Sequence, residues 1–158
     1  MSELGLGDLL KEVHRRWVRW QEVEQDAPIP QWQIEDLDIP WMPYETYMRA
    51  KILHAAPMEM GLLFVEFPPG KAEDNRFHIH PISARIITVV SGSGAFTWCR
   101  SWDGGAPKTT HLRPGSRIWM PAGVLHTLRA DADGLLVQSI HLPWVPLEHP
   151  ACLIYPWD

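Results

Sequence analysis

The sequence predicts an all-β chain folded as a barrel or sandwich, preceded by an amphipathic helix and an extended arm. Short runs of apolar and β-branched residues recur from residue 47 onward, and glycine- and proline-containing turns separate them. The expected strands are 48–53, 61–67, 85–91, 95–102, 108–112, 116–120, 126–130 and 135–142. The expected turns are 68–70, 92–94, 103–105, 113–115 and 133–134.

The N-terminal region, residues 1–46, is expected to be distinct from the barrel, residues 47–158, which ends in a C-terminal tail. Six apolar residues recur there at intervals of three and four with charged residues between them, the pattern of an amphipathic helix. They are Leu6, Leu9, Leu10, Val13, Trp17 and Trp20. Residues 27–46 are rich in proline, tryptophan and acids, which suits an extended arm. Both charge signs on the polar face favour packing on the barrel or on a second subunit over membrane binding. The arm and the Trp-bearing helix carry more apolar surface than a small barrel needs, so we expect a homodimer.

Composition excludes several functions. With 158 residues, 46% of them hydrophobic and 21% charged, the chain has the make-up of one soluble domain. The net charge is −5 without a basic stripe, which argues against nucleic-acid binding. No basic N-terminus precedes an apolar run and no segment reaches the length of a membrane span, so a cytoplasmic location is expected. Cys99 and Cys152 are too few for a disulfide scaffold and are expected to be free thiols.

Two histidines lie two positions apart in Phe77-His78-Ile79-His80, and a third ends the segment Pro121-Ala122-Gly123-Val124-Leu125-His126. Alternate strand residues share a face, so His78 and His80 are expected to project into one cavity. Imidazole binds Zn, Fe, Ni, Cu or Mn, and His126 is the natural third ligand. The pattern predicts one divalent metal ion. A single histidine would more often be an ordinary polar residue, as we expect for His14, His54, His111 and His149.

These residues resemble the two motifs of the cupin family. Gly70, His78, His80 and Gly92 match the first motif, and Gly115, Pro121, Gly123 and His126 match the second. The likeness covers about residues 40–145, and residues 65–144 are similar to the small single-domain cupins related to 2,4'-dihydroxyacetophenone dioxygenase. The resemblance implies a double-stranded β-helix, or jelly-roll barrel. Where the family pattern has a glutamate ligand, this chain has Ala84 and Arg85.

An expected hairpin would bring a fourth histidine, His141, close to the predicted metal site. A two-residue turn at Asp133-Gly134 would set His141 directly opposite His126, and a four-residue loop would keep the two on one face. His141 is therefore a candidate fourth metal ligand or a nearby acid/base, the alternative being a surface histidine.

The missing glutamate leaves the charge of a divalent ion uncompensated, which favours anionic or enolisable oxygen ligands. If Arg85 points inward, it would take part in catalysis by binding such an anion; if it points outward, it is a solvated side chain. Residues expected on the cavity wall suit an aromatic or polyketide-like substrate, with ordinary core packing as the alternative. They are Phe64, Phe96, Trp98, Trp119 and Met120.

Three function classes follow. The resemblance to three-histidine cupins implies first an Fe(II) dioxygenase cleaving an aromatic or enolisable hydroxy-ketone or diketone. The second is a non-redox cyclase, isomerase or decarboxylase using Zn or Ni, and Mn is a further candidate metal. The third is a ligand-sensing module. Three histidines with open positions favour the first class, and four with none favour the others.

Overall fold

This computed structural model describes residues 37–45, 47–69, 76–99 and 105–156. These residues include seven strands, and all paired strands are antiparallel. No helix occurs among these residues, and none there could therefore cross a membrane. The predicted N-terminal helix and most of the arm lie outside the described residues. The strands are β1 (Met42–Tyr44), β2 (Met48–Ala55), β3 (Gly61–Phe67), β4 (Ala84–Cys99), β5 (Lys108–Leu112), β6 (Arg117–Met120) and β7 (Leu125–Leu142).

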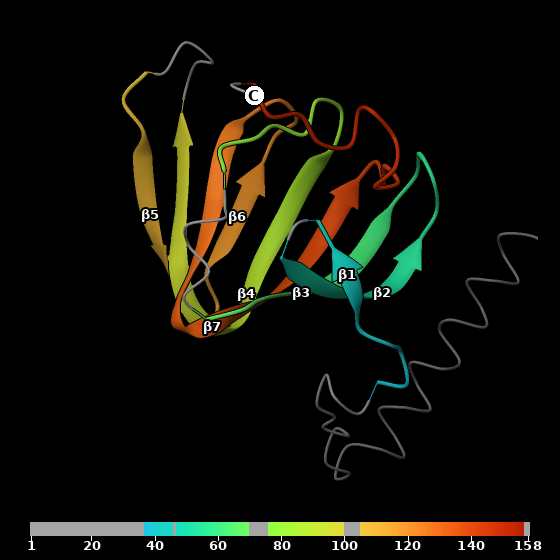
Figure 1. Ribbon diagram of the computed structural model, residues 1–158, viewed down its shortest axis with the longest axis horizontal. Coiled ribbons are helices and arrows are strands. Elements are labelled where there is room, and N and C mark those ends of the chain that lie inside the picture. Colours follow the sequence, from blue (N-terminus) through green and yellow to red (C-terminus); the bar gives the residue numbers. More distant parts are fainter. Residues whose placement is uncertain (1–36, 46, 70–75, 100–104, 157–158) are drawn as a thin grey trace, which may run out of the picture. The chain divides into compact units, whose positions relative to one another are not determined.

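The strands form one sheet that folds around a common interior (Figure 1). Neighbours follow the order β1-β2-β3-β7-β4-β5, and β6 pairs with β4 beside this path. The all-β prediction is confirmed for the described residues, and β3 and β5 have the predicted bounds. The last residues of the predicted arm form β1, which pairs with β2 through Met42–Ala50 and Tyr44–Met48.

The expected hairpin at Asp133-Gly134 is wrong, because β7 runs without reversal from Leu125 to Leu142. The expected turn at 92–94 is likewise absent, because β4 runs through it. The two strands pair along their whole length, with Gly92 opposite Leu135 and Gly94 opposite Ala130. Residues 131–134 therefore form a bulge opposite Ser93, whose hydroxyl donates to Asp131 Oδ2 at 2.9 Å. Bulges of this kind bend a strand, and here β4 and β7 bend together.

The bulge also changes which residues of β7 point inward. Before it, the buried core positions are Leu128 and Ala130; after it, they are Leu135 and Val137. Four residues of β7, 131–134, stand against Ser93 alone, so the bulge adds three residues. Because three is an odd number, the inward-facing positions change from even to odd residue numbers. His126 and His141 are consequently both buried, 4% and 2% exposed, on the inner face. They share that face along one bent strand instead of across a hairpin.

The interior is filled mainly by aliphatic side chains contributed by all the long strands. Leu63 and Val65 of β3, Ile87 and Val89 of β4 and Val137 of β7 pack in one cluster. Burial of each such side chain contributes about 1.5–3 kcal/mol. A smaller cluster of Ile79, Cys99 and Leu125 packs separately.

Candidate metal centre

The His-x-His segment lies in extended conformation between β7 and the C-terminal tail. On one side, His78 and His126 exchange backbone hydrogen bonds of 2.9 and 3.0 Å; on the other, Ile79 and Ile154 exchange bonds of 2.9 and 3.0 Å. Alternation then turns Ile79 into the small apolar cluster, where Phe77 packs against it. His78 and His80 project to the opposite side, as the sequence predicted.

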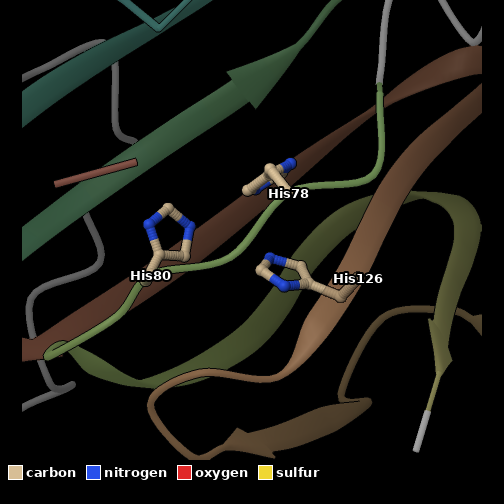
Figure 2. Close-up of side chains that lie close together, drawn as sticks. All are labelled: His78, His80 and His126. Carbon is tan, nitrogen blue, oxygen red and sulfur yellow. The ribbon is translucent and has the colours of Figure 1, made fainter. Parts of the chain in front are cut away.

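The three motif histidines come together in the barrel (Figure 2). One ring nitrogen from each lies within 4.8 Å of the others. The ring centroids are 5.0 Å apart for His78 and His80, 4.3 Å for His78 and His126, and 5.3 Å for His80 and His126. An ion binds each imidazole nitrogen at about 2.0–2.1 Å, so one ion can serve a group of this size.

The hydrogen bonds of the three rings determine which nitrogen faces an ion. His78 Nδ1 lies 2.9 Å from the carbonyl of Arg76, His80 Nδ1 lies 2.7 Å from that of Cys152, and His126 Nδ1 lies 2.8 Å from that of Val124. A carbonyl oxygen only accepts, so each Nδ1 carries the proton and donates it. Each Nε2 is left with a free lone pair, the arrangement typical of metal-binding histidines.

His80 gives the clearest test of whether a metal fits. Its Nε2 is buried and has no hydrogen-bond partner among the described residues. Arg85 Nη2 lies 3.0 Å from His80 Nδ1, and a hydrogen bond there would require the opposite tautomer. That tautomer would deprive the Cys152 carbonyl of its shorter bond and leave a buried Nε2–H without an acceptor. The tautomer with an unprotonated Nε2 is therefore favoured, and it suits a divalent metal.

The environment keeps all three imidazoles neutral. Burial lowers the pKa of His78 below its ordinary value. Burial, together with the charges of Arg85 and the neighbouring histidines, holds the pKa of His80 well below that value. Burial and the charge of His78 do the same to the pKa of His126. A neutral imidazole has the lone pair that metal binding requires.

Arg85 points inward, which settles the orientation that the sequence left open. It is 7% exposed, shares its face of β4 with Ile87 and Val89, and pairs across the sheet with His141. The alternation begins anew at β4, because residues 81–83 are not in a strand. The Arg85 guanidinium forms a buried ion pair with Glu45, with 3.5 Å between Nη1 and Oε1.

Glu45 is the functional candidate that sequence reasoning missed. It directly follows β1 and lines the same pocket as His78, His126, Arg85 and His141. No motif spacing relates residue 45 to the histidines, since it reaches them only through the pairing of β1 with β2. The acidic composition of the arm was the one available signal, and it did not single out this carboxylate.

His141 lies in the pocket but outside the group of three. Its Nε2 is 3.0 Å from the hydroxyl of Ser139, and its ring packs 5.4 Å from that of Trp144. Burial and the charge of Arg85 hold its pKa well below the ordinary value. Among the described residues, the group able to share one ion comprises His78, His80 and His126.

The pocket lining differs from the expected aromatic wall, because most of its apolar side chains are not aromatic and its aromatic members besides the histidines are Tyr44 and Phe67. Of the five predicted wall residues, Met120 lines the pocket. Trp119 is 64% exposed, because adjacent residues of β6 face opposite ways and Met120 takes the inner side. Phe96 belongs to the core, and its ring centroid lies 5.7 Å from that of His126. Trp98 is half-buried beside Lys108. Phe64 is buried but does not line the pocket. The apolar lining consists of Met48, Val65, Phe67, Ile87, Met120, Leu128 and Val137.

No protein-family model matches the chain, and no curated protein matches its sequence. Solved structures do match. A conserved protein with a double-stranded β-helix domain from Klebsiella pneumoniae is 14% identical, with 80% of this chain and 96% of that chain covered and a TM-score of 0.55. The Fe(II) form of HppE is 18% identical, with 73% and 60% covered and a TM-score of 0.55. The cupin domain of Schizosaccharomyces pombe Cnp3 is 9% identical, with 72% and 74% covered and a TM-score of 0.53.

At these sequence identities, the solved structures show the fold alone. The possible metal site is indicated by the histidine group of this chain. The structural neighbours are double-stranded β-helix and cupin proteins, as the two sequence motifs implied. The three buried imidazoles converge where those motifs predict a metal. The chain therefore has the double-stranded β-helix fold of the cupins and carries in its barrel a group of three histidines that could hold one metal ion.

Proposed function

We propose that this protein is a metal-dependent enzyme acting on small molecules, specifically an Fe(II) dioxygenase that cleaves an aromatic or enolisable hydroxy-ketone or diketone. The observation that carries the proposal is the group of His78, His80 and His126, three neutral donors with no carboxylate among them. Three protein ligands are fewer than such an ion takes, which leaves positions for substrate and O₂.

The metal ion, when bound, would supply Lewis acidity toward an enolate or hydroxy-ketone and redox chemistry with O₂. His78, His80 and His126 would hold it through Nε2, and the carbonyls of residues 76, 152 and 124 orient the rings. Arg85 would donate hydrogen bonds to an oxygen of the substrate, since its guanidinium lines the same pocket. Aliphatic side chains such as Val65, Leu128 and Val137 would exclude water and pack against the carbon skeleton.

His141 is assigned to positioning within the pocket. Its ring faces the same space as Arg85, directly opposite in the β4–β7 pairing. Low basicity keeps it neutral, so it can exchange a hydrogen bond with Ser139 and the substrate without adding charge. HppE, a structural neighbour, is solved with Fe(II), which supports iron as the first metal to test.

The test begins with protein purified without oxygen and analysed for bound metal. The Fe(II)-loaded protein is then screened for O₂ consumption with aromatic hydroxy-ketones and diketones. The proposal predicts that O₂ is consumed in step with the conversion of substrate. His126→Ala should neither consume O₂ nor convert substrate. The matched control is His111→Ala on exposed β5, which should consume O₂ like the wild type.

Other outcomes would identify the competing classes. Substrate conversion that proceeds equally without O₂ would contradict the dioxygenase and indicate a Lewis-acid cyclase, isomerase or decarboxylase. Ligand binding without any conversion, in protein with a full complement of metal, would indicate a sensing module instead of an enzyme.

A further inference from the structure

A buried ion pair lies beside the three histidines without belonging to their group. Glu45 Oε1 lies 3.5 Å from Arg85 Nη1, and the two side chains are 6% and 9% exposed. Both residues line the pocket together with His78 and His126. A ligand bound next to the metal group therefore meets one fixed anion and one fixed cation of the protein.

The pairing of these two charges is incomplete. A separation of 3.5 Å exceeds the roughly 2.7–2.9 Å of a charge-assisted hydrogen bond. Among the described residues, neither Glu45 Oε1 nor Arg85 Nε has a hydrogen-bond partner, although both atoms are buried. Buried polar atoms are normally satisfied, so one free acceptor and one free donor in the same pocket point to a ligand that bonds to both.

The backbone at Glu45 supports a specific role for this carboxylate. Its φ is 52°, in the left-handed region that residues other than glycine seldom adopt. Such a conformation persists where the surrounding structure requires it, often at a binding site. Here it accompanies a side chain that is turned into the barrel and set against Arg85.

We propose that Glu45 determines specificity by neutralising the positive charge of Arg85 and thereby excluding ligands that carry a carboxylate. The pair is net neutral, and a second carboxylate approaching Arg85 would be repelled by the first. A neutral ligand with a carbonyl oxygen and a neighbouring hydrogen-bond donor can bond to Arg85 Nε and Glu45 Oε1 instead. The inference rests on the proposed function for the pocket as substrate site, and narrows its substrates to neutral, enolisable compounds.

The test measures binding, which needs no turnover. Benzoate and benzamide have the same size and differ in charge, so their dissociation constants are compared by calorimetry on Zn(II)-loaded protein. In Glu45→Gln, the ratio of the benzoate to the benzamide dissociation constant should fall by about 10-fold or more, because no carboxylate then neutralises the charge of Arg85 or repels benzoate. The matched control is Glu66→Gln, which removes the partner of Arg49 on the outer surface and should leave the ratio unchanged.

Two further variants make the result decisive. Glu45→Ala should give the same gain for benzoate, and the double variant with Glu45→Gln and Arg85→Gln should lose it. An unchanged ratio in Glu45→Gln would overturn the inference, as would a gain that survives removal of Arg85. Loss of bound Zn(II) in Glu45→Gln would also overturn it, because Glu45 would then be a metal ligand. These readouts are independent of O₂ consumption, so a failure of the dioxygenase assay is distinguishable from a failure of the role of Glu45.

Discussion

At the scale of single residues, the three motif histidines differ from His141 in what their rings contact. Each motif histidine donates Nδ1–H to a backbone carbonyl and presents Nε2 to its neighbours. His141 instead uses Nε2 toward Ser139. We expect His141→Ala to keep a full equivalent of metal while turnover falls about 10–100-fold, the usual loss when a residue around a metal site is removed. Elemental analysis and steady-state rates measure the two effects, and loss of metal would instead make His141 a ligand.

The lowered pKa values of four buried histidines predict how the metal-free protein responds to acid. His78, His80, His126 and His141 remain neutral in the folded state, whereas in the unfolded chain they take up protons near pH 6.5. The unfolded state then binds more protons, so the free energy of unfolding falls as pH drops below about 6.5. Each histidine contributes a loss of up to about 1.4 kcal/mol per pH unit. Urea unfolding between pH 8 and 5 measures this loss, and a flat profile would contradict it.

Sequence reasoning predicted the metal group because its information is local. His78 and His80 are two apart, and a short turn precedes His126, so alternation alone places them. The inward direction of Arg85 depended on where β4 begins, which Pro81 obscured. Glu45 depended on the pairing of β1 with β2, a tertiary relation that no spacing encodes.

At the scale of elements, the glycines at the expected turns 92–94 and 133–134 do not end strands. They lie where the continuous strands β4 and β7 bend. Gly92 and Gly134 both have φ of 77°, which favours glycine in turns and bulges alike. The Asp133-Gly134 pair matches the sequence preferred in hairpin turns. It forms a bulge here because β4 pairs with β7 on both sides of it, a relation that the local sequence does not show. The inference that His126 and His141 share a face was therefore reached from a turn that does not exist.

The bend can be tested by comparing two glycines of similar φ. A Cβ on Gly92 would lie 2.1 Å from the carbonyl oxygen of Gly134, whereas a Cβ on Gly115, with φ of 86°, would meet nothing within 4 Å. Gly115→Ala should cost about 1 kcal/mol from backbone strain alone, and Gly92→Ala about 3 kcal/mol or more. Urea unfolding of both variants measures the difference. Equal costs would mean that the backbones do not meet closely at the bend.

At the scale of the whole molecule, the N-terminal region carries the prediction of a homodimer. Residues 1–36 lie outside the described residues, so the expected helix remains a prediction from its Trp- and Leu-bearing face. An apolar face of this kind usually packs on a partner. Sedimentation velocity should show a dimer for the full chain and a weaker dimer, or exposed apolar surface, after deletion of residues 1–26. A monomer at every concentration of the full chain would contradict the prediction.

The central claim is that His78, His80 and His126 hold one divalent metal ion, and metal stoichiometry tests it most directly. His80 is the sharpest position, because its buried Nε2 has no other partner among the described residues. Protein purified without oxygen should contain about one equivalent of metal in the wild type and in the exposed control His111→Ala, since three neutral imidazoles suffice to bind it. His80→Ala should contain almost none. A full equivalent of metal retained by folded His80→Ala would contradict the account.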